Sequence, residues 1–179
     1  MAASAGSGTA PAPEEPVRRF SARVLVIDAQ DRVLLLRGGD PARPEKVIWH
    51  TPGGGIEPGE DAAAAARREL VEETGLVAGA VDGPVWRRRL QFSFDQQQYD
   101  QSETFFVVRV DHHEVDSSGH SDLERRYLSG HRWWSVAELR ATDELVAPPD
   151  MADRLDDLLC GRTPLHPAEP VEVGGAVFP

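Results

Sequence analysis

Cysteine is almost absent from this chain of 179 residues, and long hydrophobic runs are missing altogether. The single Cys160 excludes an internal disulfide and a cysteine-rich zinc site, which is typical of proteins in a reducing compartment. No apolar run approaches the length needed to cross a bilayer, and the first residues lack the basic region and apolar segment of a signal peptide. These absences predict a cytoplasmic protein that is not embedded in a membrane.

Positive charge is also scarce. The chain has 19 Lys and Arg residues against 30 Asp and Glu residues, giving a net charge of -11. This balance argues against nucleic acid or an anionic membrane surface as the main partner. An acidic protein can still bind a small polyphosphate if metal ions and a few local arginines supply positive charge. A homodimer is compatible with the sequence.

The composition divides the chain into one domain and two tails. Residues 1–17 are rich in Ala, Gly, Ser, Pro and Glu, so we expect a flexible tail. Residues 18–161 carry the hydrophobic patterns of a single domain, and residues 162–179 form a Pro- and Gly-rich tail.

The first half of the domain begins with two strand-like runs at 20–28 and 32–38, which predict a hairpin. We expect a loop over 38–46 and then a short strand that leads to the glycines at 53–55. Trp49, beside this strand, is expected to pack in the core.

In the second half, residues 85–94 and 103–110 read as two strands that flank a polar loop. Residues 111–130 read as a long loop, whose histidines are better explained as solvated side chains than as zinc ligands. A short strand with Trp133 and Trp134 follows, and an amphipathic helix over 150–160 closes the domain.

The most informative segment is the helix predicted over 61–74. It contains no Pro or Gly, and Gly75 follows it where a helix C-cap belongs. At about 100° per residue, Glu69, Glu72 and Glu73 fall within an arc of roughly 100° on one face.

Three crowded carboxylates repel one another unless a cation lies between them, and oxygen ligands suit Mg²⁺ or Mn²⁺. The alternative is an ordinary solvated face in which Arg68 pairs with Glu72. The three glycines at 53–55 favour the metal site, because they let the backbone approach a ligand closely.

The stretch from Gly54 to Leu76 resembles the signature box of the Nudix hydrolases. It reads Gly-x5-Glu-x7-Arg-Glu-Leu-x-Glu-Glu-x-Gly-Leu, and every fixed position of the box is filled. The resemblance implies an α/β (α+β) domain, a Nudix-like α/β/α sandwich. In it, a mixed β-sheet lies between the metal-binding helix and a C-terminal helix.

The resemblance also assigns roles to residues of the box. Glu69, Glu72 and Glu73 match the metal-binding glutamates, and the Gly54 carbonyl is a further ligand. Either Glu69 or Glu73 would also activate the attacking water. Arg68 and Glu60 would orient these carboxylates through hydrogen bonds.

Two sites outside the box follow from the same resemblance. An arginine at the position of Arg37 often meets substrate phosphate in Nudix-like sequences, although an exposed strand-end cation is the alternative. A further catalytic carboxylate often comes from a loop near 111–130, where Asp122 and Glu124 are candidates and Glu124 is preferred.

For two sets of charged residues in the later strands, the sequence allows two alternative roles. Arg87, Arg88 and Arg89 are expected to protect an edge strand, with phosphate or ribose contact as the alternative. Glu103 is expected to be an exposed carboxylate at a strand end, with a place in the cleft as the alternative.

The function that follows is metal-dependent hydrolysis of the pyrophosphate bond in a nucleoside diphosphate linked to another moiety. The default substrate is a nucleoside triphosphate, including an oxidised one, because the single-residue markers of several other substrate groups are missing. Two alternatives are a catalytically inactive Nudix-fold module that binds nucleotides or proteins, and an acidic interaction domain without chemistry.

Overall fold

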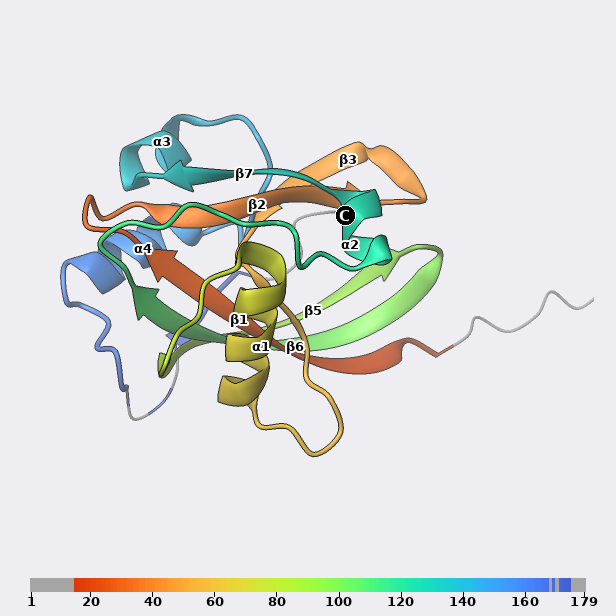
Figure 1. Ribbon diagram of the computed structural model, residues 1–179, viewed down its shortest axis with the longest axis horizontal. Helices are drawn as coiled ribbons and strands as arrows, with labels where there is room; N and C mark the ends of the chain where they lie inside the picture. Colours follow the sequence, from red (N-terminus) through yellow and green to blue (C-terminus); the bar gives the residue numbers. More distant parts are fainter. Residues whose placement is uncertain (1–14, 168, 170, 175–179) are drawn as a thin grey trace, which may run out of the picture.

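The computed structural model describes residues 15–167, 169 and 171–174, apart from the side chains of Leu123 and Glu124. All the strands in the described residues belong to one sheet, which has helices on either side (Figure 1). The strands are β1 (Val17–Ile27), β2 (Val33–Asp40), β3 (Arg43–His50), β4 (Gly53–Gly55), β5 (Asp82–Phe94), β6 (Gln97–Arg109), β7 (Leu128–Trp134), β8 (Val146–Ala147) and β9 (Val171–Glu172). The helices are α1 (Ala62–Thr74), α2 (Asp122–Tyr127), α3 (Val136–Ala141) and α4 (Met151–Leu159). No helix in these ranges is long and apolar enough to span a membrane.

The sheet is mixed. Its strand order is β8-β3-β2-β1-β6-β5-β9, with β4 paired to β1 and β7 paired to β2. β1 runs parallel to β6, whereas the β1–β2, β2–β3 and β5–β6 pairs are antiparallel. The predicted mixed sheet is confirmed.

Alternation along β1 builds two cores, one on each face of the sheet. Val24 and Val26 pack with Ala65 and Leu70 of α1. The neighbouring Leu25 and Ile27 face the other way and pack with Met151, Leu155 and Leu158 of α4. The predicted sandwich between the box helix and a C-terminal helix is therefore confirmed (Figure 1).

Both ends of α1 carry caps. The Asp61 side chain accepts a hydrogen bond from the Ala64 N–H at 2.7 Å, which satisfies one of the free donors of the first turn. Gly75 has φ 71° and its N–H donates to the Val71 carbonyl at 2.9 Å. The predicted helix and its C-cap glycine are confirmed.

The loop predicted over residues 38–46 is wrong. β2 continues to Asp40 and β3 begins at Arg43, so only two residues connect them. The Asp40 carboxylate accepts from the Ala42 N–H and from Arg43 Nε, both at 2.9 Å, and these bonds hold the tight turn.

The polar loop predicted between residues 94 and 103 is also wrong. β5 and β6 form a long hairpin whose turn is Asp95-Gln96, with φ values of 47° and 68°. Positive φ at both central residues is the geometry of a two-residue hairpin turn. Gln97 and Gln98, which suggested a loop, lie in β6.

The long loop predicted over 111–130 contains α2 and the start of β7. Its first part wraps the C-terminal end of α1. His113 Nε2 donates to the Thr74 carbonyl at 2.8 Å, and His120 Nε2 donates to the Glu73 carbonyl at 2.9 Å. These bonds satisfy carbonyls that a helix end leaves without partners, so the two histidines are not merely solvated.

The chain beyond residue 161 was expected to be a tail. β9 nevertheless pairs with β5, and Val173 is buried against the α4 side of the sheet. Part of the segment 162–179 therefore packs on the domain.

Candidate active site

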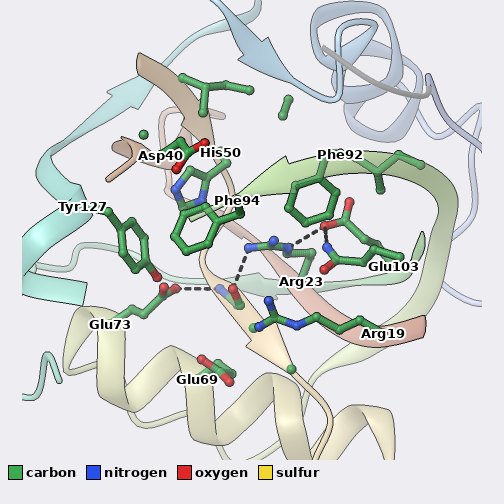
Figure 2. A pocket seen from close by; sticks show the side chains of 18 of the residues that line it. Arg19, Arg23, Asp40, His50, Glu69, Glu73, Phe92, Phe94, Glu103 and Tyr127 are labelled. Atoms are coloured by element: carbon green, nitrogen blue, oxygen red, sulfur yellow. Dashed lines mark hydrogen bonds and ion pairs between the residues drawn. The ribbon is translucent and has the colours of Figure 1, made fainter. Parts of the chain in front are cut away.

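A cavity of about 380 Å³ opens between α1, the glycine strand β4 and the long hairpin β5–β6. The carboxylates of α1 and the glycines form one wall; Phe92 and Phe94 of β5 lie across the cavity from it, and Tyr127 of α2 lies beside Glu73 (Figure 2). Arg23, from β1, lies between this wall and the two phenylalanine rings.

The glycine wall depends on the absence of side chains. β4 pairs antiparallel with β1, which brings Gly53 and Gly54 against α1. The Gly53 N–H donates to Glu73 Oε2 at 2.6 Å, and Gly53 has φ 131°, a conformation that favours glycine. A Cβ at Gly54 would lie 2.6 Å from Glu69 Oε1. Only glycine therefore lets this strand lie directly against the glutamates.

Arg68 links the carboxylates on the helix. Its Nη1 donates to Glu69 Oε1 at 2.8 Å and to Glu72 Oε2 at 3.3 Å. Its Nε and Nη2 donate to the two Glu60 oxygens at 3.1 and 2.9 Å, and Nη2 also reaches the Gly55 carbonyl at 2.9 Å. The structure thus brings Arg68 and Glu60 to the places from which the predicted orienting role could be exercised.

Burial and charge act in opposite directions on these acids. Burial raises the pKa of Glu69, although the Arg68 guanidinium partly opposes the shift. Hydrogen bonds from Arg68 lower the pKa of Glu60. Glu69 is therefore a better proton acceptor than an ordinary glutamate.

The donor set of α1 fits a hard divalent cation in its chemistry, because all the candidate ligands are oxygens. Glu69, Glu72 and Glu73 lie within two turns of one helix, and the Gly54 backbone lies against Glu69. Among the described residues, no three His, Cys, Asp or Glu side chains are gathered closely enough to hold an ion as they stand. Two of the carboxylates are bound to Arg68 and the third to the Gly53 N–H.

The floor of the cavity is a buried ion cluster on three adjacent strands. Glu103 is 2% exposed and accepts from Arg23 Nε at 2.9 Å, from Arg88 Nε at 2.7 Å and from Gln101 Nε2 at 2.7 Å. The expectation of an exposed strand-end carboxylate at Glu103 is wrong, and so is the expectation that Arg88 only protects a strand edge.

Arg23 is the functional candidate that the sequence reasoning missed. It lines the cavity although it stands between the buried apolar residues Ala22 and Val24. A charged residue in the middle of an apolar strand was the available signal, since such a charge needs a buried partner.

The far end of the cavity is aromatic. Phe92, Phe94 and Tyr127 line it, and Phe94 meets Tyr127 edge-on with ring centroids 5.6 Å apart. Figure 2 shows the Tyr127 hydroxyl pointing toward Glu73. His50 also lines this end, and burial lowers its pKa to about 4, so its imidazole is neutral at pH 7. Trp49 is buried in the core, edge-on to Trp134, as predicted.

Two predicted site residues are not placed in the cavity. Arg37 does not line it; its Nη1 donates to Ser129 Oγ at 3.2 Å, and its Nε lies 4.0 Å from Glu144. Asp122 is fully exposed and pairs with Arg125. Glu124 lies in α2 between two lining residues, Ser121 and Tyr127, but its side chain lies outside the described part of the structure.

The charges of the lining balance before any ligand binds. Among the described side chains, five cationic and five carboxylate groups line the cavity: Arg19, Arg23, Arg43, Lys46 and Arg88, and Asp40, Glu69, Glu72, Glu73 and Glu103. A divalent ion at the glutamates would make the cavity positive, although the protein is acidic. Such a cavity can hold a phosphate chain between the metal and the arginines and a flat ring at the aromatic end.

Comparison with known proteins places these features in a family. A family model described as NUDIX domain matches residues 17–157. The chain is 31% identical over 141 residues to an RNA pyrophosphohydrolase of Sphingopyxis alaskensis, covering 73% of this chain and 84% of that protein. It is 40% identical over 149 residues to an RNA pyrophosphohydrolase of Caulobacter vibrioides, covering 75% and 80%. The fold is similar to that of the E. coli dihydroneopterin triphosphate pyrophosphohydrolase, with a TM-score of 0.59, 16% identity, and coverage of 81% of this chain and 99% of that one.

Proposed function

Because the chain belongs to the Nudix hydrolase family and is a pyrophosphohydrolase of that family, we propose that its substrate is a nucleoside triphosphate and its metal Mg²⁺. The observation that carries the proposal is the single cavity in which the α1 carboxylates, two buried arginines and an aromatic end face one another. These three parts match the metal, the phosphates and the base of a nucleotide.

Different residues would hold the metal and orient its ligands. Glu69, Glu72, Glu73 and the Gly54 carbonyl would hold the metal, which neutralises phosphate charge and makes a bound water more acidic. Arg68 keeps Glu69 and Glu72 in place through its hydrogen bonds.

A carboxylate takes the proton of the attacking water. Glu69 and Glu73 are the two candidates, as the resemblance to the box implies. Glu124 remains a predicted additional base, because α2 lies at the rim of the cavity.

The aromatic end would bind the base. Phe92 and Phe94 offer ring faces and edges for contact, and the neutral His50 Nδ1 is bound to the Thr51 carbonyl at 3.1 Å. The base would be bound there by burial against these side chains and by stacking.

The experiment is a screen of common and oxidised nucleotides with product masses determined. We expect a nucleoside monophosphate and pyrophosphate, or a diphosphate and phosphate, to form with Mg²⁺ or Mn²⁺. We also expect EDTA to abolish turnover and mildly alkaline pH to raise it. Full turnover in excess chelator would contradict the metal mechanism, and nucleotide binding without turnover would support the inactive-module alternative.

A second candidate substrate is the triphosphorylated 5′ end of an RNA, as the names of the two bacterial relatives suggest. Beside the cavity lies a shallow hollow lined by Arg18, Arg89 and Phe20, which is 62% exposed; Arg19 borders both spaces. Arginines beside an exposed aromatic ring suit a nucleotide strand. A 5′-triphosphorylated dinucleotide should then be preferred over the free triphosphate, and Phe20→Ala should remove that preference only.

A further inference from the structure

The guanidinium of Arg23 is fixed at two of its three nitrogens. Nε donates to Glu103 Oε1 at 2.9 Å. Nη1 donates to the Gly53 carbonyl at 2.5 Å and reaches the Thr51 carbonyl at 3.5 Å. Nη2 has no hydrogen-bond partner among the described residues. Figure 2 shows the group in the middle of the cavity, between Phe94 and the glycine strand.

A second arginine lies beside Arg23. Arg23 and Arg88 share one carboxylate, Glu103, and all three side chains are at most 18% exposed. Because Nη2 of Arg23 is not used by Glu103, a bound anion can accept from it without displacing that carboxylate. Gln101 adds a neutral hydrogen bond and no charge.

The place of Arg23 relative to the glutamates fits a phosphate between them. The Gly53 carbonyl accepts from Arg23 while the Gly53 N–H donates to Glu73, so a single residue separates the arginine from a candidate metal-binding carboxylate. A phosphate held by a metal at Glu73 would therefore lie within reach of the arginine.

We propose that Arg23 donates from Nη2 to a non-bridging phosphate oxygen of the substrate, with Glu103 holding the guanidinium in place. Arg23 would thus make the phosphate contact that the sequence resemblance assigned to Arg37. This inference rests on the proposed function, because it takes the ligand to be a diphosphate-bearing molecule. The fixed guanidinium loses little conformational freedom on binding, which favours the contact.

Arg23→Lys is the test. Lysine keeps a positive charge beside Glu103 but has no second terminal nitrogen that could replace Nη2 as a donor to the phosphate. We expect KM for the nucleotide to rise and kcat/KM to fall by about 10- to 100-fold, as for a lost charged hydrogen bond. The Mg²⁺ concentration that gives half-maximal activity and the thermal unfolding midpoint should stay at wild-type values. Arg109→Lys is the matched control, since Arg109 ends β6 outside the cavity and contacts Asp31 at 3.2 Å.

Three results would overturn the proposal. The first is wild-type KM and kcat in a folded Arg23→Lys protein. The second is a loss of activity accompanied by an equal shift in the Mg²⁺ requirement, since Arg23 would then act through Gly53 and Glu73. If Arg23→Lys does not fold, the double variant Arg23→Gln with Glu103→Gln replaces it. The third result that would overturn the proposal is wild-type KM and kcat in this double variant.

Calorimetric titration with pyrophosphate in the presence of Mg²⁺ separates this inference from the proposed function. If no nucleotide is hydrolysed by the wild type, the proposed function fails. A weaker pyrophosphate affinity in Arg23→Lys than in Arg109→Lys would still support the phosphate contact, and equal affinities would refute it.

Discussion

The α1 wall and the β-strand floor of the cavity have opposite charge imbalances. At α1, Arg68 pairs with three carboxylates, Glu60, Glu69 and Glu72, and a fourth, Glu73, accepts from the Gly53 N–H. On the floor, two arginines share the single carboxylate Glu103. Clustered carboxylates favour the binding of a metal cation, and neighbouring arginines favour the binding of an anion. The two regions together are complementary to a metal-bound phosphate chain, which neither region would be alone.

The carboxylates of the two regions are also held in place by different contacts. The α1 carboxylates are half-buried or buried at the cavity surface and rely on one arginine and one backbone N–H. Glu103 lies beneath the cavity, and the neighbouring arginines lower its pKa to about 2 against the effect of burial. Removing a charge should therefore cost activity in the first region and stability in the second.

The largest effect is expected on α1. Glu69→Gln, Glu72→Gln and Glu73→Gln should each lower kcat by a factor on the order of 10³ or more, because glutamine cannot replace a charged ligand or a base. The wild-type fold should be kept, since one of several repelling charges is removed. Steady-state kinetics and circular dichroism measure both. Glu57→Gln, on an exposed residue outside the fixed box positions, is the control, and equal turnover in all four proteins would refute the enzyme assignment.

At the floor of the cavity, we expect removal of a charge to lower stability more than activity. Glu103→Gln removes the carboxylate that Arg23 and Arg88 both contact and should lower the free energy of unfolding by about 3–5 kcal/mol at pH 7. The folded pKa of Glu103, about 2, lies below its ordinary value of 4.5, so its stabilisation is present above pH 4.5 and is lost as the pH falls toward 2.

Urea unfolding between pH 7 and 2 checks this dependence. The wild type should lose stability more steeply than Glu103→Gln below pH 4.5. Parallel curves for the two proteins would show that Glu103 is not the source of the acid sensitivity.

Arg68→Ala should have an intermediate effect. Arg68 binds Glu60, Glu69 and Glu72 but is not a ligand itself, so kcat should fall about 10- to 100-fold while the metal requirement remains. Arg67→Ala is a neighbouring control on the same helix, because Arg67 does not line the cavity. If Arg68→Ala were as active as Arg67→Ala, the arginine would have no role in orienting the carboxylates.

The smallest effect is expected at the aromatic end. Phe94→Leu keeps an apolar side chain but removes the ring, and an aromatic contact contributes about 0.5–1.5 kcal/mol. KM should therefore rise about 2- to 12-fold with kcat little changed. A fall in kcat at constant KM would place Phe94 with the chemistry and not with base binding.

The sequence predicted the α1 wall far better than the floor, for a physical reason. The wall lies in one continuous segment, where helix periodicity and the box spacing place the glutamates and Arg68 together. The floor combines β1, β5 and β6, so it depends on strand register. Once the turn is placed at Asp95-Gln96, the antiparallel register opposes Arg88 to Glu103 directly. The polar composition of that turn region concealed the hairpin, and with it the cluster.

The most direct test of the central claim is thermal unfolding with and without Mg²⁺, for the wild type and the three α1 glutamine variants. If α1 carries an excess of negative charge that a metal relieves, the metal-free variants should unfold at or above the wild-type midpoint. Mg²⁺ should then raise the wild-type midpoint clearly and the variant midpoints less. A wild-type midpoint that Mg²⁺ leaves unchanged, or variants that gain as much as the wild type, would contradict the account.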